Sequence, residues 1–173
     1  MRFRGTCYRA HDPKWAFSPL SGDGAKVYGG RFNPKSMSAL YLALAVDSLF
    51  AEMGHDLAHR FELLTVCSYD VDVEGIVDFR ADPVADMDCA WRYEVANGRE
   101  PTSWRLARRL IASGNAGLIV PSFAPGARAD MANLVLWRWG PDLPHRVVVH
   151  DPSGRLPKNQ TYRRESFAAP ELS

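Results

Sequence analysis

The chain has 173 residues, of which 46% are hydrophobic, and 21 basic against 20 acidic residues give it a formal net charge of +1. This length and apolar content predict one domain, or one domain with a small subdomain. The near-neutral charge creates no global field that would attract nucleic acid or an anionic membrane, so neither is expected as a partner. Any anion-binding site must therefore be local.

The N-terminal segment and the cysteines indicate the compartment. The opening residues MRFRGTCYRA lack the apolar core of a signal peptide, and no apolar run approaches the roughly 20 residues that cross a bilayer. Cys7, Cys67 and Cys89 are odd in number and have no CxxC spacing, which argues against a disulfide framework and a structural zinc site. We expect a cytoplasmic protein with buried thiols.

The first elements are predicted from apolar patterns. Residues 6–10 (TCYRA) fit a short strand, and residues 11–30 form a loop longer than a simple connection needs, which is often a functional feature. The continuous apolar run at residues 39–44 (ALYLAL) predicts a buried strand. Apolar residues at helical spacing then predict a helix over residues 46–59, with Asp47 near its N-terminus.

The rest of the chain contains both strands and helices without regular alternation. The predicted elements are strands at residues 62–73 and 76–79, helices at 86–96 and 102–114, and strands at 117–121, 133–139 and 146–150. This order favours an α+β domain over a doubly wound sheet. We expect one domain over residues 1–155 and a polar, proline-containing tail over residues 156–173, extended or partly disordered.

Arg31 is the first candidate for binding a ligand. It follows Gly29 and Gly30, which have no side chains and so let a ligand approach the main chain. A guanidinium can pair with phosphate through two parallel hydrogen bonds, which lysine cannot copy. The glycines match neither the P-loop nor GxGxxG, so a loop with a solvated surface arginine is the competing interpretation.

Four separated blocks of the sequence occur in the order that a known family has. They are YRAHDP, PLSGDGAKVYGGRFNP, ALYLAL with the helix that carries Glu52, and LIVPSFAPGARADMANLVLW. Together they cover most of the chain and closely resemble the RES-domain toxins, which are named for their arginine, glutamate and serine. The resemblance implies a fold like that of ADP-ribosyltransferases, consumption of NAD+, and an Xre-type antitoxin as partner.

The resemblance also assigns residues. The family's arginine falls on Arg31, its glutamate on Glu52 and its serine on Ser122, and these three are the expected catalytic residues. Tyr41 matches the tyrosine of the YLA strand, and Tyr28 is a weaker match. The expected NAD+-binding residues are Arg9, Tyr28, Gly30, Arg31, Tyr41 and Ser122.

These residue types suit cleavage of the nicotinamide–ribose bond of NAD+. Nicotinamide leaves from a nitrogen that is already cationic, so the barrier lies in forming an oxocarbenium-like ribose, which Glu52 can stabilise through a ribose hydroxyl. The Tyr41 ring can pack against the pyridinium. Ser122 can hydrogen-bond the ligand or position Glu52. Arg9, on the first predicted strand, can bind phosphate, and an ordinary charge at the end of a strand is its alternative interpretation.

The expected function is therefore that of a toxin that cleaves NAD+ and arrests growth. A protein side chain, water and phosphate are all open as acceptors of ADP-ribose. The expected partners are an antitoxin that covers the active site and, where a protein is the acceptor, that target. No metal is expected.

Other functions fit parts of the sequence. Glu52, His55 and His59 have helical i, i+3 and i+7 spacing, which suits a metal site, although HDLAH has aspartate where HExxH has its catalytic glutamate. A Cys/His hydrolase needs an exposed, activated thiol, whereas Cys67 falls in a predicted buried strand. Without the resemblance, Tyr41 fits a core aromatic and Glu52 a solvated helix face.

A non-enzymatic interaction module is the main alternative. RLARR in the Trp104 helix would supply a small basic patch for a partner. Four tryptophans would supply the rest of the partner surface, namely Trp91, Trp104, Trp137 and Trp139. Partial burial within the domain is the structural alternative for these side chains.

Overall fold

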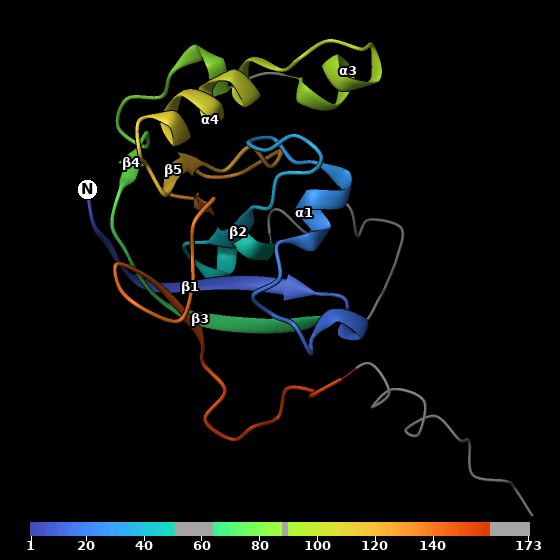
Figure 1. Cartoon of the computed structure of the whole chain (residues 1–173), viewed down its shortest axis with the longest axis vertical. Helices are drawn as coiled ribbons and strands as arrows, with labels where there is room; N and C mark the ends of the chain where they lie inside the picture. Colours follow the sequence, from blue (N-terminus) through green and yellow to red (C-terminus); the bar gives the residue numbers. More distant parts are fainter. Residues whose placement is uncertain (51–63, 88–89, 160–173) are drawn as a thin grey trace, which may run out of the picture.

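The computed structural model describes residues 1–50, 64–87 and 90–159, and this part is built on one seven-stranded mixed sheet (Figure 1). The strands are β1 (Phe3–His11), β2 (Leu40–Ala43), β3 (Thr65–Val73), β4 (Ile76–Asp78), β5 (Gly117–Pro121), β6 (Ala132–Leu136) and β7 (His145–Val149). Their spatial order is β4-β5-β6-β2-β1-β3-β7, and only the β4–β5 pair among them is parallel.

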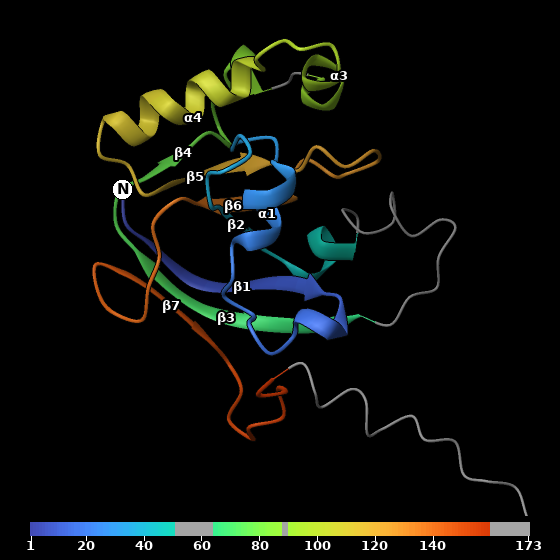
Figure 2. The ribbon, with the colours of Figure 1, turned by 45° about the vertical axis from the view of Figure 1, so that its right-hand side comes forward.

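The described helices are short and lie outside the sheet. Those described over their full length are α1 (Asp23–Tyr28), α3 (Trp91–Ala96) and α4 (Thr102–Ala112), with 3-10 turns η1 (Pro13–Trp15) and η2 (Ala85–Met87), and residues 46–50 are also helical. Figures 1 and 2 both place α4 over the β4–β5 half of the molecule, away from β1 and β3. A mixed sheet with helices outside it confirms the predicted α+β class.

The central strands are buried on both faces. Along β5, Leu118 and Val120 pack in one core cluster with Leu106 of α4, whereas Ile119 packs in a second cluster with Tyr69 of β3. Successive side chains of a strand point to opposite faces, so a strand buried on both faces is apolar throughout. This explains why continuous apolar runs identified β2 and β5.

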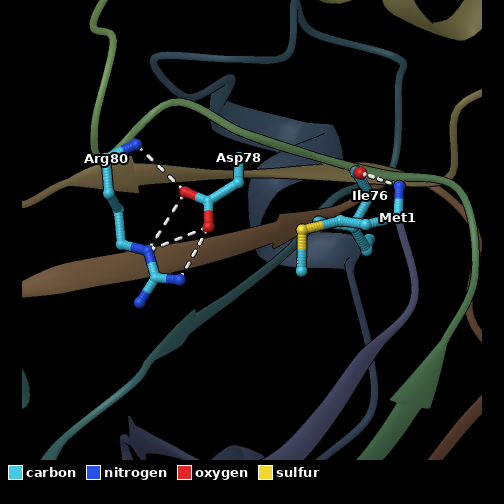
Figure 3. A network of polar contacts seen from close by, with 4 residues as sticks. All are labelled: Met1, Ile76, Asp78 and Arg80. Atoms are coloured by element: carbon cyan, nitrogen blue, oxygen red, sulfur yellow. Dashed lines mark hydrogen bonds and ion pairs between the residues drawn. The ribbon is translucent and has the colours of Figure 1, made fainter.

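The N-terminus binds the first residue of the edge strand β4. The Met1 ammonium donates to the Ile76 carbonyl at 2.7 Å (Figure 3). The Ile76 N–H also donates to the Met1 carbonyl, at 2.9 Å. At the end of β4, the Arg80 guanidinium pairs with both carboxylate oxygens of Asp78. The two contacts with Met1 use backbone groups of Ile76 that an edge strand would otherwise expose.

Three sequence predictions need correction. The segment over residues 11–30 is not a continuous loop, because it contains η1 and α1, and Ser21 Oγ accepts a hydrogen bond from the N–H of Asp23 at the start of α1. A single helix over residues 86–96 is also wrong, since η2 and α3 are separate elements there.

The strand predicted over residues 133–139 is too long. It ends at Leu136, because the N–H groups of Trp137 and Arg138 both donate to the Ala116 carbonyl, at 2.8 and 3.2 Å, instead of extending the ladder. Of the helix predicted over residues 46–59, residues 46–50 are helical and the rest lies outside the described residues.

No helix in the described ranges is both long and apolar enough to cross a bilayer.

Gly117 marks the tightest backbone contact of the central sheet, which gives a test of the fold. A Cβ there would lie 2.3 Å from the Val135 carbonyl oxygen, whereas a Cβ at Gly140 would meet nothing within 4 Å. We therefore expect Gly117→Ala to lower the free energy of unfolding by about 2–3 kcal/mol and Gly140→Ala to change it by less than about 0.5 kcal/mol, measured by urea denaturation. Equal stability of the two variants would contradict the described β5–β6 packing.

Candidate functional site

The Arg31 side chain is held in a fixed direction. Its Cζ lies 4.1 Å from the centroid of the Phe123 ring, and its Nη1 donates to the Met87 carbonyl at 3.2 Å. Phe123 belongs to the segment after β5, and Met87 ends η2. The guanidinium therefore lies on an aromatic face in a position set by two distant segments.

Arg31 and Tyr41 line the same cavity, which has a volume of about 260 Å³. Its walls come from the Arg31 loop, β2, α3, β5 and β6. The lining residues are Arg31, Phe32, Tyr41, Trp91, Arg92, Val120, Phe123, Ala124, Pro125, Asn133 and Val135. Two guanidinium groups and four aromatic rings in one cavity suit an anion that also carries flat rings.

Tyr41 presents its ring rather than its hydroxyl. The hydroxyl accepts a hydrogen bond from the Phe32 N–H at 3.0 Å and donates one to Asn33 Oδ1 at 2.7 Å. Burial raises the pKa of this phenol well above its ordinary value, so Tyr41 is neutral. Proton transfer through Tyr41 is therefore disfavoured, and the ring remains for packing.

Gly30 has a packing role that the sequence did not reveal. A Cβ on Gly30 would lie 2.5 Å from the Tyr41 hydroxyl oxygen and 2.6 Å from Asn33 Oδ1. The space beside its α-carbon is thus occupied by the protein itself. The binding of a ligand at Gly30 stays a prediction.

Ser122 lies directly before the cavity residues Phe123 and Ala124. Its N–H donates to the Met131 carbonyl at 2.8 Å, and its Oγ accepts from the Ala124 N–H at 3.2 Å. The hydroxyl therefore shapes the turn that carries Phe123. Glu52, the predicted carboxylate, lies outside the described residues.

Arg9 and Tyr28 line a different cavity, of about 560 Å³, between β1, η1 and α1. Arg9 Nη1 donates to the carbonyls of Pro19 and Ser21 at 3.3 and 2.9 Å, and burial lowers the pKa of the guanidinium. In the described part of the chain no carboxylate forms an ion pair with Arg9. Tyr28 is 77% exposed at the rim.

His11 is a buried member of this second cavity that the sequence analysis did not single out. Its Nε2 lies 2.6 Å from the Tyr69 hydroxyl, which itself donates to the Pro19 carbonyl at 2.9 Å, so Nε2 carries the proton. Burial and the neighbouring Arg9 charge lower the pKa of His11 to about 4. His11 is therefore neutral at pH 7.

The profile of the RES domain matches residues 6–159. The chain belongs to the RES-domain family. Among solved structures, the crystal structure of the M. tuberculosis MbcT–MbcA toxin–antitoxin complex contains a similar chain, with a TM-score of 0.57 and 19% sequence identity over 87% of this chain and 84% of that chain. This likeness supports a common fold. No curated protein matches the sequence.

The described residues test the cysteine alternative but not the metal site predicted at Glu52, His55 and His59. Cys7 and Cys67 are buried thiols, as predicted, and burial raises the pKa of Cys7 to about 12. An activated thiolate at Cys7 is thus disfavoured. In the described ranges no three potential metal ligands cluster; His55 and His59 lie outside these ranges.

Three of the four tryptophans are partly buried and use their indole N–H groups within the domain. Trp104 donates to the Gly30 carbonyl at 2.8 Å, Trp137 to the Phe32 carbonyl at 3.0 Å and Trp139 to the Leu20 carbonyl at 3.0 Å. The packing interpretation is therefore confirmed for these three, and they supply little surface to a partner.

The buried neutral His11 predicts a dependence of stability on pH. Its folded pKa of about 4 lies below the ordinary histidine pKa of 6.5, so the unfolded chain binds the proton first as pH falls. The contribution of neutral His11 to the unfolding free energy is complete above about pH 6.5 and is lost progressively as pH falls toward 4. Between pH 7.5 and 4.5 we expect the RES domain to lose about 2–3 kcal/mol more unfolding free energy than His11→Gln, which keeps an N–H donor. Parallel losses in the two proteins would show that His11 does not titrate in this way.

Proposed function

We propose that this RES domain is the toxin of a toxin–antitoxin pair and cleaves the nicotinamide–ribose bond of NAD+. It then transfers ADP-ribose to a protein side chain, to water or to phosphate, and the loss of NAD+ or the modification of a target arrests growth. The observation that carries the proposal is the Arg31 guanidinium, fixed over Phe123 in the cavity that Tyr41 also lines.

The cation positions suit the pyrophosphate of a dinucleotide. Arg31 and Arg92 line one cavity, and bidentate pairing of a guanidinium with phosphate oxygens gives both strength and direction. Arg9 provides a further partly buried cation in the second cavity. A bound phosphate there would offset the cost of burying the guanidinium charge, which lowers its pKa.

The cleavage step needs no acid in this arrangement. The bond between ribose C1′ and the pyridinium nitrogen breaks, and its electron pair leaves with nicotinamide. Glu52 stabilises the positive charge that develops on the ribose through a hydroxyl group, and the Tyr41 ring packs against the departing pyridine. A lone pair of the acceptor then forms the new bond to C1′, and the proton of the acceptor passes to solvent. Ser122 holds the turn next to the reacting groups.

An antitoxin of Xre type is proposed as the partner that covers this site. The solved structure of similar fold is that of a toxin–antitoxin complex. An enzyme that consumes NAD+ harms its own host unless it is inhibited, so the activity itself calls for such a partner. We further propose that the protein acts in the cytoplasm. Its single domain spans residues 1–155, and residues 156–173 form its tail.

Nicotinamide release from NAD+ by the purified protein tests the enzymatic function. We expect Arg31→Ala to lower kcat/KM at least about 100-fold by weakening the binding of NAD+, and Glu52→Gln to lower kcat at least about 100-fold by removing charge stabilisation in the transition state, while the fold is kept in both. Arg105→Ala and Glu74→Gln, at exposed positions, are matched controls with unchanged rates. If the folded wild type releases no nicotinamide in the absence of antitoxin, the enzymatic proposal fails and an interaction module is favoured.

Growth of a bacterial host tests the toxin proposal separately. Expression of the chain alone is expected to stop growth, and co-expression of its cognate antitoxin is expected to restore it. Arg31→Ala, expressed to the same level, serves as the control that leaves growth normal. Normal growth with an enzymatically active wild type would argue for a role other than that of a toxin.

A further inference from the structure

Side chains from distant parts of the chain bind three consecutive carbonyl groups around Arg31. Trp104 Nε1 donates to the Gly30 carbonyl at 2.8 Å, Ser103 Oγ to the Arg31 carbonyl at 2.5 Å and Trp137 Nε1 to the Phe32 carbonyl at 3.0 Å. A surface loop normally leaves such carbonyls to water. Here the carbonyl of Arg31 and the carbonyls of the residues before and after it each accept a hydrogen bond from a protein side chain.

The donors are themselves rigidly placed. Ser103 and Trp104 lie in the first turn of α4, and Ser103 is 0% exposed. Trp137 directly follows β6 and is partly buried. A helix and the end of a central strand thus fix the loop from outside, while the Tyr41 hydroxyl accepts from the Phe32 N–H on the sheet side.

This arrangement restricts the direction of the Arg31 side chain. A long side chain loses rotamer freedom when it binds a ligand, and that cost falls when its backbone and ring contact are already fixed. The Phe123 ring and the Met87 carbonyl hold the guanidinium, and the three donors hold the peptide from which it extends. The loop is therefore preorganised before any ligand arrives.

We propose that Ser103, Trp104 and Trp137 are positioning residues that hold Arg31 in the orientation that binds the pyrophosphate of NAD+. The inference rests on the proposed function. The pyrophosphate takes no part in bond breaking, so its contact with Arg31 is equally strong in the ground state and the transition state. Loss of positioning is thus expected to weaken NAD+ binding and raise KM with little change in kcat.

The experiment compares Ser103→Ala, Trp104→Phe and Trp137→Phe with wild type. The dissociation constant of ADP-ribose, which is not consumed, is measured by calorimetry, and KM and kcat are measured for NAD+. We expect each variant to raise the dissociation constant and KM about 5- to 10-fold, with kcat within about twofold of wild type. Ser113→Ala is the matched control, because its Oγ donates to the Arg109 carbonyl at the far end of the same helix at 3.0 Å.

A double-mutant cycle separates positioning from general stability. In the Arg31→Ala background, Ser103→Ala should have almost no further effect on ADP-ribose binding, because the guanidinium whose position it sets is gone. All measurements are made well below the melting temperature of each variant. A Ser103→Ala protein that binds like wild type, or one whose effect persists in full beside Arg31→Ala, would overturn the inference. A folded wild type that neither binds ADP-ribose nor cleaves NAD+ would instead refute the proposed function, and this inference with it.

Discussion

The Tyr41 hydroxyl is the contact on which the loop around Arg31 depends. It joins β2 to the Phe32 N–H and to Asn33, and Asn33 Nδ2 donates in turn to the carbonyls of Ala25, Pro34 and Met37. One buried phenol and one buried amide thereby connect the sheet, α1 and the loop. Buried polar groups are costly when unpaired, so a network in which each has partners specifies a single loop conformation.

That network explains how a short loop can present a cation to a cavity. The backbone around Arg31 is bound by Tyr41 of β2 on one side and by α4 and Trp137 on the other. The Arg31 guanidinium packs on the Phe123 ring. The cation is thus carried by an irregular segment but has its position set by the sheet and a helix. A formal net charge of +1 is compatible with an anion site because the positive charges that matter here are local.

The sequence predicted the elements whose burial is complete. β2 and β5 are apolar on both faces, which makes them visible as continuous runs. α1 was missed because six residues with a glycine among them show no helical period, and its start depends on a hydrogen bond to Ser21. The end of β6 depends on both Trp137 and Arg138 bonding to one carbonyl, which no local pattern encodes.

The sequence identified candidate residues of the site, but it did not identify the tertiary contacts that place them. Family resemblance selected Arg31 and Tyr41 together, and both line one cavity. At Gly30 a side chain would meet the Tyr41 hydroxyl, which is a tertiary contact between the Arg31 loop and β2 that no local pattern encodes. Phe123, Trp91 and Arg92 complete the cavity from segments far along the chain, and sequence spacing alone could not bring them together.

The binding mode of NAD+ can be seen in a crystal structure of the Glu52→Gln variant with the dinucleotide bound. We expect pyrophosphate oxygens within hydrogen-bond distance of the Arg31 guanidinium and the nicotinamide ring against the face of Tyr41. A dinucleotide bound with neither contact, its pyrophosphate remote from Arg31, would contradict this binding mode.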